Sequence, residues 1–244
     1  KMRLDDTNYG GLAIAGNYAY VGITANWWGI AGLEVIDISN PTNPVKVSTL
    51  QDINDVRDIY ISGKYAYVAT VNSLAEFAII DISDPTDLKV VGSYNAPYYS
   101  YGVYVKDNYA YLASATSGLF IIEVSDPTNP ILRGQYNTSN SAEDVVVSGN
   151  YAYVADGNNL TILDVSNPYS PTLADSVSVK AQGIKLGGNY VYLASQNDGL
   201  TVVDVTDPSD ISIIGSYDTN ASGAMVDVAG KYAYLADGSG GMAI

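Results

Sequence analysis

A short aromatic motif returns six times along the chain at nearly constant spacing. Each copy consists of a tyrosine, an alanine or valine, and a second tyrosine; the copies begin at Tyr18, Tyr65, Tyr109, Tyr151, Tyr190 and Tyr232. The steps between them are 47, 44, 42, 39 and 42 residues. Their mean of about 43 residues is the length of a four-stranded propeller blade and is longer than the ankyrin or tetratricopeptide repeat. The chain therefore repeats one supersecondary unit six times.

Each period contains four short runs with the composition of β-strands. A two-residue turn that tolerates positive φ, such as Gly149-Asn150, joins the first run to the aromatic run. The third run ends on an acidic residue, and a turn of the form Asp-x-Ser-x-Pro follows, in which proline cannot extend a strand ladder. We therefore predict an all-β fold: residues 1–244 form a single domain, a six-bladed β-propeller of four-stranded antiparallel blades.

The last period is incomplete, and this affects how the predicted ring closes. Its sequence stops at Gly241–Ile244, inside the third strand, so that the fourth strand is missing. Residues 1 to about 5 precede the first period at the place of a fourth strand. We expect this N-terminal segment to join the last blade, because closure of the ring removes exposed sheet edges.

The third strand and its turn also carry a family resemblance. The run Leu200–Asp204 with Pro208, preceded by the Tyr-x-Tyr strand, resembles the LVIVD repeat of bacterial and archaeal surface proteins, a β-propeller family. The resemblance extends over nearly the whole chain, with five turn motifs and six aromatic motifs in register. It implies a secreted or cell-surface propeller that is one module of a longer polypeptide, and it brings no catalytic residues.

The composition excludes most catalytic and metal-binding devices. The chain has no histidine and no cysteine, which excludes a Ser-His-Asp triad, thiol nucleophiles, disulfides and zinc sites of His or Cys. Its 26 acidic and 11 basic residues give a net charge of −15, which repels nucleic acid and anionic lipid headgroups. We expect no nucleic-acid partner, no membrane insertion by this segment and no cofactor. The composition does not exclude the binding of Ca²⁺.

The irregular segments of the repeat predict a contact surface. In a four-stranded meander the regular turns share one face, while the loops between the second and third strands and the blade connections share the other. Two of these irregular segments, residues 24–30 and 95–101, are rich in aromatic residues. Their aromatic side chains are Trp27, Trp28, Tyr98, Tyr99 and Tyr101. Such rings suit stacking on sugars or anchoring a protein contact, so we predict protein or glycan binding here.

A group of charged residues near the predicted axis supports a different interpretation. Its members are Asp55, Arg57, Asp58, Glu143 and Asp144. Asp58 and Asp144 stand at a strand start where three of the other blades have glycine. Paired carboxylates could perform general acid–base chemistry or bind Ca²⁺, or they could form a ring of solvated acids. The alternative function is therefore a propeller hydrolase or lyase that acts on a sugar or lactone.

Three Asn-x-Ser/Thr sequons begin at Asn137, Asn159 and Asn220. They predict glycosylation if the protein is secreted where such glycans are made, although a chain rich in Asn, Ser and Thr also produces sequons by accident. A third interpretation is an architectural repeat in an envelope layer that self-assembles through contacts between discs. We expect a non-catalytic binding or structural module, extracellular or at the cell surface, and not an enzyme.

Overall fold

A computed structural model describes residues 8–24, 31–51, 53–71, 75–195, 199–219 and 223–244. Contacts within the chain divide it into two compact units: residues 1–112 with 122–132, and residues 113–121 with 133–244. The first two sheets belong to the first unit, and the last three belong to the second. The boundary passes through the third sheet, which has strands in both. No helix among the described residues is long and apolar enough to cross a membrane.

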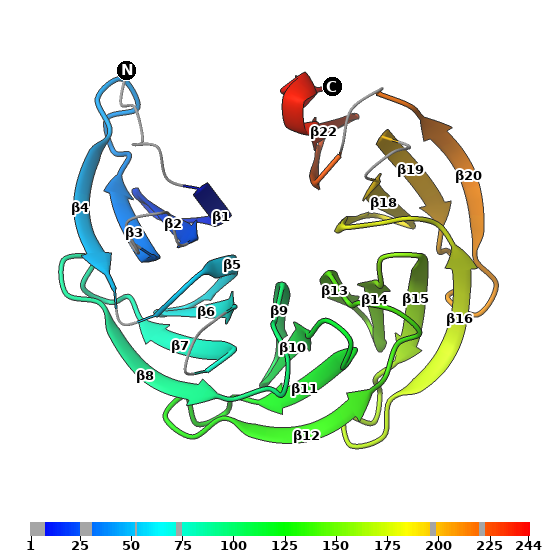
Figure 1. Cartoon of the computed structure of the whole chain (residues 1–244), viewed down its shortest axis with the longest axis horizontal. Coiled ribbons are helices and arrows are strands. Elements are labelled where there is room, and N and C mark those ends of the chain that lie inside the picture. The colour runs from blue at the N-terminus through cyan, green and yellow to red at the C-terminus, as the bar shows by residue number, and fades with distance from the viewer. Residues whose placement is uncertain (1–7, 25–30, 52, 72–74, 196–198, 220–222) are drawn as a thin grey trace. The chain divides into compact units, whose positions relative to one another are not determined.

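The chain folds into six antiparallel sheets, which are the blades of a six-bladed β-propeller (Figure 1). Among the described residues, five sheets have four strands in chain order, and the sixth has three. The first three sheets contain β1 (Asn8–Ala15), β2 (Tyr18–Thr24), β3 (Gly32–Asp37), β4 (Val45–Leu50), β5 (Val56–Ser62), β6 (Tyr65–Thr70), β7 (Phe77–Asp81), β8 (Lys89–Tyr94), β9 (Gly102–Lys106), β10 (Tyr109–Ala113), β11 (Leu119–Glu123) and β12 (Ile131–Tyr136). The last three contain β13 (Asp144–Ser148), β14 (Tyr151–Ala155), β15 (Asn159–Asp164), β16 (Thr172–Ser178), β17 (Gly183–Gly187), β18 (Tyr190–Ser195), β19 (Gly199–Asp204), β20 (Ser212–Tyr217), β21 (Met225–Ala229), β22 (Tyr232–Ala236) and β23 (Met242–Ala243).

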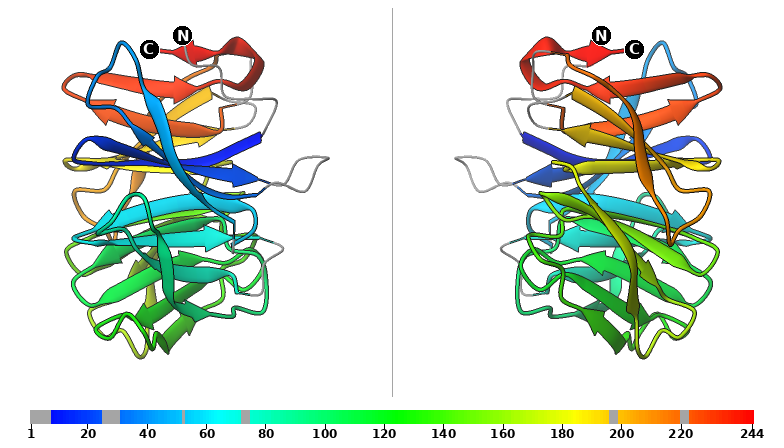
Figure 2. Two further views of the ribbon diagram at one scale, coloured as in Figure 1. Left: turned by 90° about the vertical axis from the view of Figure 1, so that its left-hand side faces the viewer. Right: turned by 90° about the vertical axis from the view of Figure 1, so that its right-hand side faces the viewer.

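These sheets confirm the fold class predicted from the repeat. Within a blade the strands are twisted, and the outermost strand crosses the inner ones obliquely (Figure 2). The first strand begins at Asn8, and its pairing with β2 contains an irregularity between Tyr9 and Leu12. The predicted closure of the ring by residues 1–5 lies outside the described residues.

The hairpin between the first two strands of each blade has the predicted turn. Its first residue has a positive φ in every blade, between 53 and 63°. The six residues are Gly16, Gly63, Asp107, Gly149, Gly188 and Gly230. Glycine enters this region without steric strain, and aspartate is among the residues that tolerate it best. The sequence therefore encodes these turns locally, before any packing occurs.

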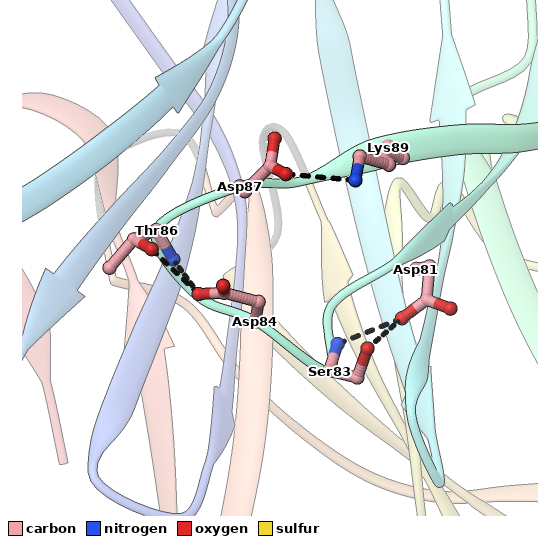
Figure 3. Close-up of polar contacts among 6 residues, drawn as sticks. All are labelled: Asp81, Ser83, Asp84, Thr86, Asp87 and Lys89. Carbon is pink, nitrogen blue, oxygen red and sulfur yellow. Dashed lines mark hydrogen bonds and ion pairs between the residues drawn. The ribbon is translucent and has the colours of Figure 1, made fainter.

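The turn between the third and fourth strands contains two successive hydrogen bonds from backbone to side chain, shown for the second blade in Figure 3. Oδ1 of Asp81 accepts the N–H of Ser83 at 2.9 Å, and Oδ1 of Asp84 accepts the N–H of Thr86 at 2.9 Å. Hydrogen bonds from Ser83 lower the pKa of Asp81, because they favour the ionised carboxyl. Equivalent first bonds form at Asp37, Asp164 and Asp204.

The second tyrosine of the aromatic motif packs between neighbouring sheets. Tyr20 belongs to a buried cluster with Val56 of the next blade, and Tyr153 belongs to another with Ile184. Burial raises the pKa of Tyr111, in the same position of the third blade, to about 12. The tyrosines thus contribute apolar area to the interfaces between blades.

Neighbouring blades also meet at the fourth residue of the outer strand. A Cβ atom added to Gly92 would lie 2.1 Å from the carbonyl oxygen of Pro127 in the next blade. One added to Gly134 would lie 2.1 Å from the carbonyl oxygen of Pro168. Real Cβ atoms do not approach oxygen this closely, so the backbone of the neighbouring turn occupies the space that a side chain would need.

The same strand position has a hydrogen-bonding side chain where the facing turn lacks its second proline. Ser48 donates its hydroxyl to the carbonyl of Pro85 at 2.6 Å. Asp175 accepts the N–H of Ile211 at 2.9 Å. The turns that face the two glycines have proline at the position of Ile211, and proline has no N–H to donate. The residue on one blade is therefore matched to the turn of the next.

Gly134 and Gly215 occupy this same position and form a matched pair for mutation. Gly134→Ala should lower the free energy of unfolding by about 1–3 kcal/mol, because the new methyl group displaces the facing turn. No described atom lies within 4 Å of a Cβ on Gly215, so Gly215→Ala should be neutral or stabilise by up to about 1 kcal/mol. Urea unfolding followed by circular dichroism measures both changes, and equal losses would contradict the contact.

Candidate functional site

The aromatic residues predicted to form a contact surface differ in exposure. Tyr98 and Tyr99 lie in the connection between β8 and β9 and expose 57% and 47% of their surface. Tyr101, at the end of the same connection, is half-buried. Trp27 and Trp28 lie outside the described residues. The first unit thus presents two large aromatic side chains on one blade connection.

This connection is anchored on both sides of the exposed tyrosines. Ala96 and Ser100 are buried, and the N–H of Ser100 donates to the carbonyl of Thr70 at 3.2 Å. The hydroxyl of Thr70 in turn donates to the carbonyl of Ala75 at 2.7 Å, in the loop between β6 and β7. Hydrogen bonds therefore join the two loops, and Tyr98 lies between the buried residues Ala96 and Ser100.

A glutamate in the loop before β7 also interacts with the connection between β8 and β9. Glu76 lies directly before β7, and a backbone interaction with Ala96 lowers the pKa of its carboxyl. Its Oε2 is buried and has no hydrogen-bond partner among the described residues. Burial raises the pKa of Glu76, and the backbone hydrogen bonds only partly oppose this shift. The surroundings of Glu76 therefore favour the neutral form of its carboxyl more than water does.

In five blades, the residue five positions after the first tyrosine of the aromatic motif is polar and buried. This residue shapes these loops. The residues are Thr70, Ser114, Asp156, Ser195 and Asp237. Each stands three positions after the second tyrosine of its motif. In the fourth blade, Oδ1 of Asp156 accepts the N–H of Asn159 at 2.8 Å. The prediction from the sequence did not include this position, although its polar character in five repeats distinguishes it.

The two aspartates predicted near the axis each join neighbouring blades. One carboxylate oxygen of Asp58 accepts the N–H of the following residue, and the other accepts the N–H of Val103 in the next blade at 2.8 Å. Asp144 repeats this arrangement and accepts the N–H of Ile184 at 2.9 Å. Burial raises the pKa of Asp58, whereas these backbone bonds lower it. Both carboxylates therefore have a structural role that the sequence did not reveal.

The other charged candidates have separate surroundings. Asp55 is buried with φ of 35°, and Arg57 is exposed beside an irregularity in β5. Glu143 belongs to the second unit and precedes β13. Within the described ranges, no three acidic side chains gather into a group that could hold a metal ion. A catalytic or Ca²⁺-binding role for these carboxylates stays a prediction.

The sequons also differ in their surroundings. Asn137 is exposed directly after β12. Asn159 is the half-buried first residue of β15, and the hydroxyl of its sequon residue Thr161 is buried and donates to Asp156 at 3.1 Å. Asn220 lies outside the described residues. Glycosylation of these positions stays a prediction.

The second unit contains a polar pocket with a volume of about 540 Å³, between loops of the third, fourth and fifth blades. It is lined by Thr116, Thr138, Ser139, Asn140, Ser141, Glu143, Gly157, Asn158, Lys180, Ala181 and Gln182. Glu143 is the one lining residue that sequence analysis had selected. Most of the others are amides and hydroxyls in loops, together with Lys180, Gly157 and Ala181, and they produce no periodic signal in the sequence.

Three comparisons place the chain among known proteins. The family model of the LVIVD repeat matches residues 9–52, 54–96, 99–138, 139–179, 180–219 and 222–244. No curated protein matches the sequence. Several solved structures share the fold at low identity.

A candidate 6-phosphogluconolactonase from Bacteroides uniformis is 13% identical with a TM-score of 0.79, over 94% of this chain and 78% of that one. A functionally unknown protein from Desulfotomaculum acetoxidans is 18% identical with a TM-score of 0.73, over 91% and 73%. The Cps50 (Swd1) β-propeller domain of Myceliophteria thermophila is 11% identical with a TM-score of 0.74, over 96% and 82%. At these identities the likeness concerns the fold alone.

The contact between Asp58 and the next blade predicts a graded loss of stability. Asp58→Ala leaves the N–H of Val103 without its acceptor and should lower the free energy of unfolding by about 1–3 kcal/mol. Asp58→Asn keeps one acceptor oxygen and should lose less. Urea unfolding at neutral pH gives both values. A wild-type stability for Asp58→Ala would show that the carboxylate has no structural role.

The raised pKa of Glu76 predicts that removing its charge increases the stability of the folded chain, and that this increase depends on pH. A carboxyl whose pKa is raised in the folded chain lowers stability as pH rises from its unfolded value towards the folded one. Glu76→Gln should therefore raise the melting temperature at pH 7, and the gain should vanish at about pH 4. Differential scanning calorimetry at both pH values measures this. A gain of the same size at both would contradict it.

Proposed function

Because the chain belongs to the LVIVD repeat family, we propose that it is a non-catalytic binding module of the cell surface that contacts protein or glycan through its irregular loops. The supporting observation is the exposure of Tyr98 and Tyr99 on a connection whose flanking residues Ala96 and Ser100 are buried. Two neighbouring exposed tyrosines provide apolar area together with two hydroxyl groups.

The anchoring of this connection favours recognition by preformed side chains. Binding costs about 0.5–1.5 kcal/mol for each flexible side chain that becomes ordered. Tyrosine has few rotatable bonds, and the backbone on either side of Tyr98 and Tyr99 is already fixed by burial and by the bond from Ser100 to Thr70. The entropy lost on binding is thereby reduced. A ligand with an apolar face and hydroxyl or amide groups, which describes both sugars and peptide surfaces, suits these rings.

The proposed location rests on the repeat family and on the charge of the chain. A net charge of −15 keeps a protein soluble and dispersed. A chain without cysteine needs no particular redox environment, so it is compatible with secretion. We therefore place the protein outside the cell or on its surface.

The rival function, a hydrolase or lyase acting on a sugar or lactone, lacks a comparable observation among the described residues. Both oxygens of Asp58 and of Asp144 accept backbone hydrogen bonds. An ordered Ca²⁺ on these carboxylates, or turnover abolished by Asp144→Asn, would favour the enzyme instead.

The binding proposal predicts that the two tyrosines determine affinity. Replacing Tyr98 and Tyr99 by Ala should weaken binding to the best ligand found on arrays of glycans and extracellular proteins by tenfold or more. Tyr217→Ala is a matched control, because Tyr217 exposes 69% of its surface on the outer strand of another blade. Biolayer interferometry compares the two variants. Equal affinity of the double variant and the wild type would contradict the proposal.

A further inference from the structure

We propose that the polar pocket of the second unit is a binding site for a neutral saccharide, separate from the aromatic connection between β8 and β9. The pocket volume of about 540 Å³ falls within the ~300–1,000 Å³ range of small-molecule sites. Unlike most such sites, its lining consists almost entirely of amides, hydroxyls and two charged groups.

The formal charge of the lining argues against an ionic ligand. Glu143 and Lys180 are its only charged side chains and have opposite signs. A single ammonium group attracts an anion only weakly in a protein whose net charge is −15. One carboxylate provides too few oxygen ligands for a divalent cation. The pocket therefore suits a ligand that is polar and uncharged.

The uncharged groups have the mixture of donors and acceptors that a polyol requires. Each hydroxyl of a sugar both donates and accepts, and so does each amide or hydroxyl of the lining. Residues of this kind include Thr116, Ser139, Asn140, Ser141, Asn158 and Gln182. The carboxylate of Glu143 can accept from two sugar hydroxyls in bonds strengthened by its charge. No aromatic ring occurs among the lining residues, so recognition here depends on hydrogen bonds.

The walls of the pocket are joined into one hydrogen-bonded framework. The N–H of Ala142 donates to the carbonyl of Ala115 at 2.8 Å, which links the third-blade loop to the connection that follows β12. Nδ2 of Asn158 donates to Oδ1 of Asn140 at 3.1 Å, and this bond extends the framework to the fourth-blade loop. The N–H of Ala181 donates to the carbonyl of the residue before Asn158 at 3.4 Å.

This framework fixes the orientation of the amides before a ligand arrives. The bond between Asn158 and Asn140 uses one donor of the first and one acceptor of the second, so each amide retains the opposite kind of group for a ligand. The hydroxyl of Thr138 donates to the carbonyl of Asn140 at 2.9 Å and fixes its backbone. Preformed polar groups reduce the ordering cost of binding.

Two features show that the pocket is maintained against an energetic cost. Ala115, next to the lining residue Thr116, has φ of 37°, a strained conformation for a residue with a side chain. Burial raises the pKa of Glu143, although a hydrogen bond from Ser141 lowers it. Strained backbone and partly desolvated charges concentrate at ligand sites.

The test uses the full chain and three neutral sugars: galactose, glucose and N-acetylglucosamine. Each is added at about 10 mM, well above the ~1 mM Kd of a weak complex. We expect at least one sugar to shift the amide NMR signals of Asn140, Glu143 and Gln182. Glu143→Gln and Asn140→Ala should each weaken its binding at least tenfold in calorimetric titration.

Control variants separate this site from folding and from the aromatic site. Asp210→Asn makes the same chemical change as Glu143→Gln on an exposed turn and should bind the sugar as the wild type does. Tyr98→Ala should also bind the sugar as the wild type does, because Tyr98 does not line the pocket. Failure of the proposed function would appear instead as undiminished affinity of the Tyr98 and Tyr99 double variant for its array ligand. If Glu143→Gln lowers the melting temperature, sugar binding by Gln182→Ala tests the site instead. This variant keeps the backbone hydrogen bond from residue 182 to Ala194 and should fold normally.

Several results would overturn the proposal. One is that none of the three sugars binds. Another is that Asn140→Ala and Gln182→Ala bind the sugar as tightly as the wild type does. Glycine, inorganic phosphate and CaCl₂ serve as probes for a zwitterion, an anion and a cation. Binding of one of these in preference to the sugars would show that the pocket recognises charge.

Discussion

The close approach of one blade to the next is the contact on which the rest of the structure depends. A Cβ on Gly11 would lie 2.7 Å from the Cα of Asp58, and one on Gly183 would lie 2.9 Å from the Cα of Met225. At Gly11 and Gly183 the facing backbone leaves no room for a side chain, and elsewhere in the inner strands the facing N–H groups need acceptors. Asp58 and Asp144 provide them by accepting N–H groups of the following blade. Glycine and aspartate therefore solve two parts of one packing problem.

The repeat makes this contact possible because each blade presents the same surfaces. A twisted four-stranded sheet cannot bury both faces alone, and its neighbours cover them. The second tyrosine of the motif contributes apolar area at these interfaces, as Tyr20 and Tyr153 show. Departures from the repeat at the interface are matched across it, since Asp175 accepts the N–H of Ile211 where other blades have glycine against proline.

A framework defined by repetition leaves variation to the loops, and the two proposed sites use them differently. The connection that carries Tyr98 and Tyr99 presents apolar rings between buried anchors. The pocket around Asn140 and Glu143 presents hydrogen-bonding groups held by bonds between loops. In both, the strand ends are fixed by buried polar residues such as Thr70 and Asp156. The regular hairpins on the opposite side have no such variety, because each repeats one turn.

The sequence alone determined the fold class, the number of blades and the turns, because these follow from local periodicity and from residues that fix their own backbone. Gly149 and Asp81 act within a few residues of their position. The exposure of Tyr98 and the structural use of Asp58 were decided by contacts with residues distant in the chain, which no local pattern records. The pocket likewise exists only where loops from three blades meet, so its amides, scattered from residue 140 to residue 182, acquired a common role through tertiary structure.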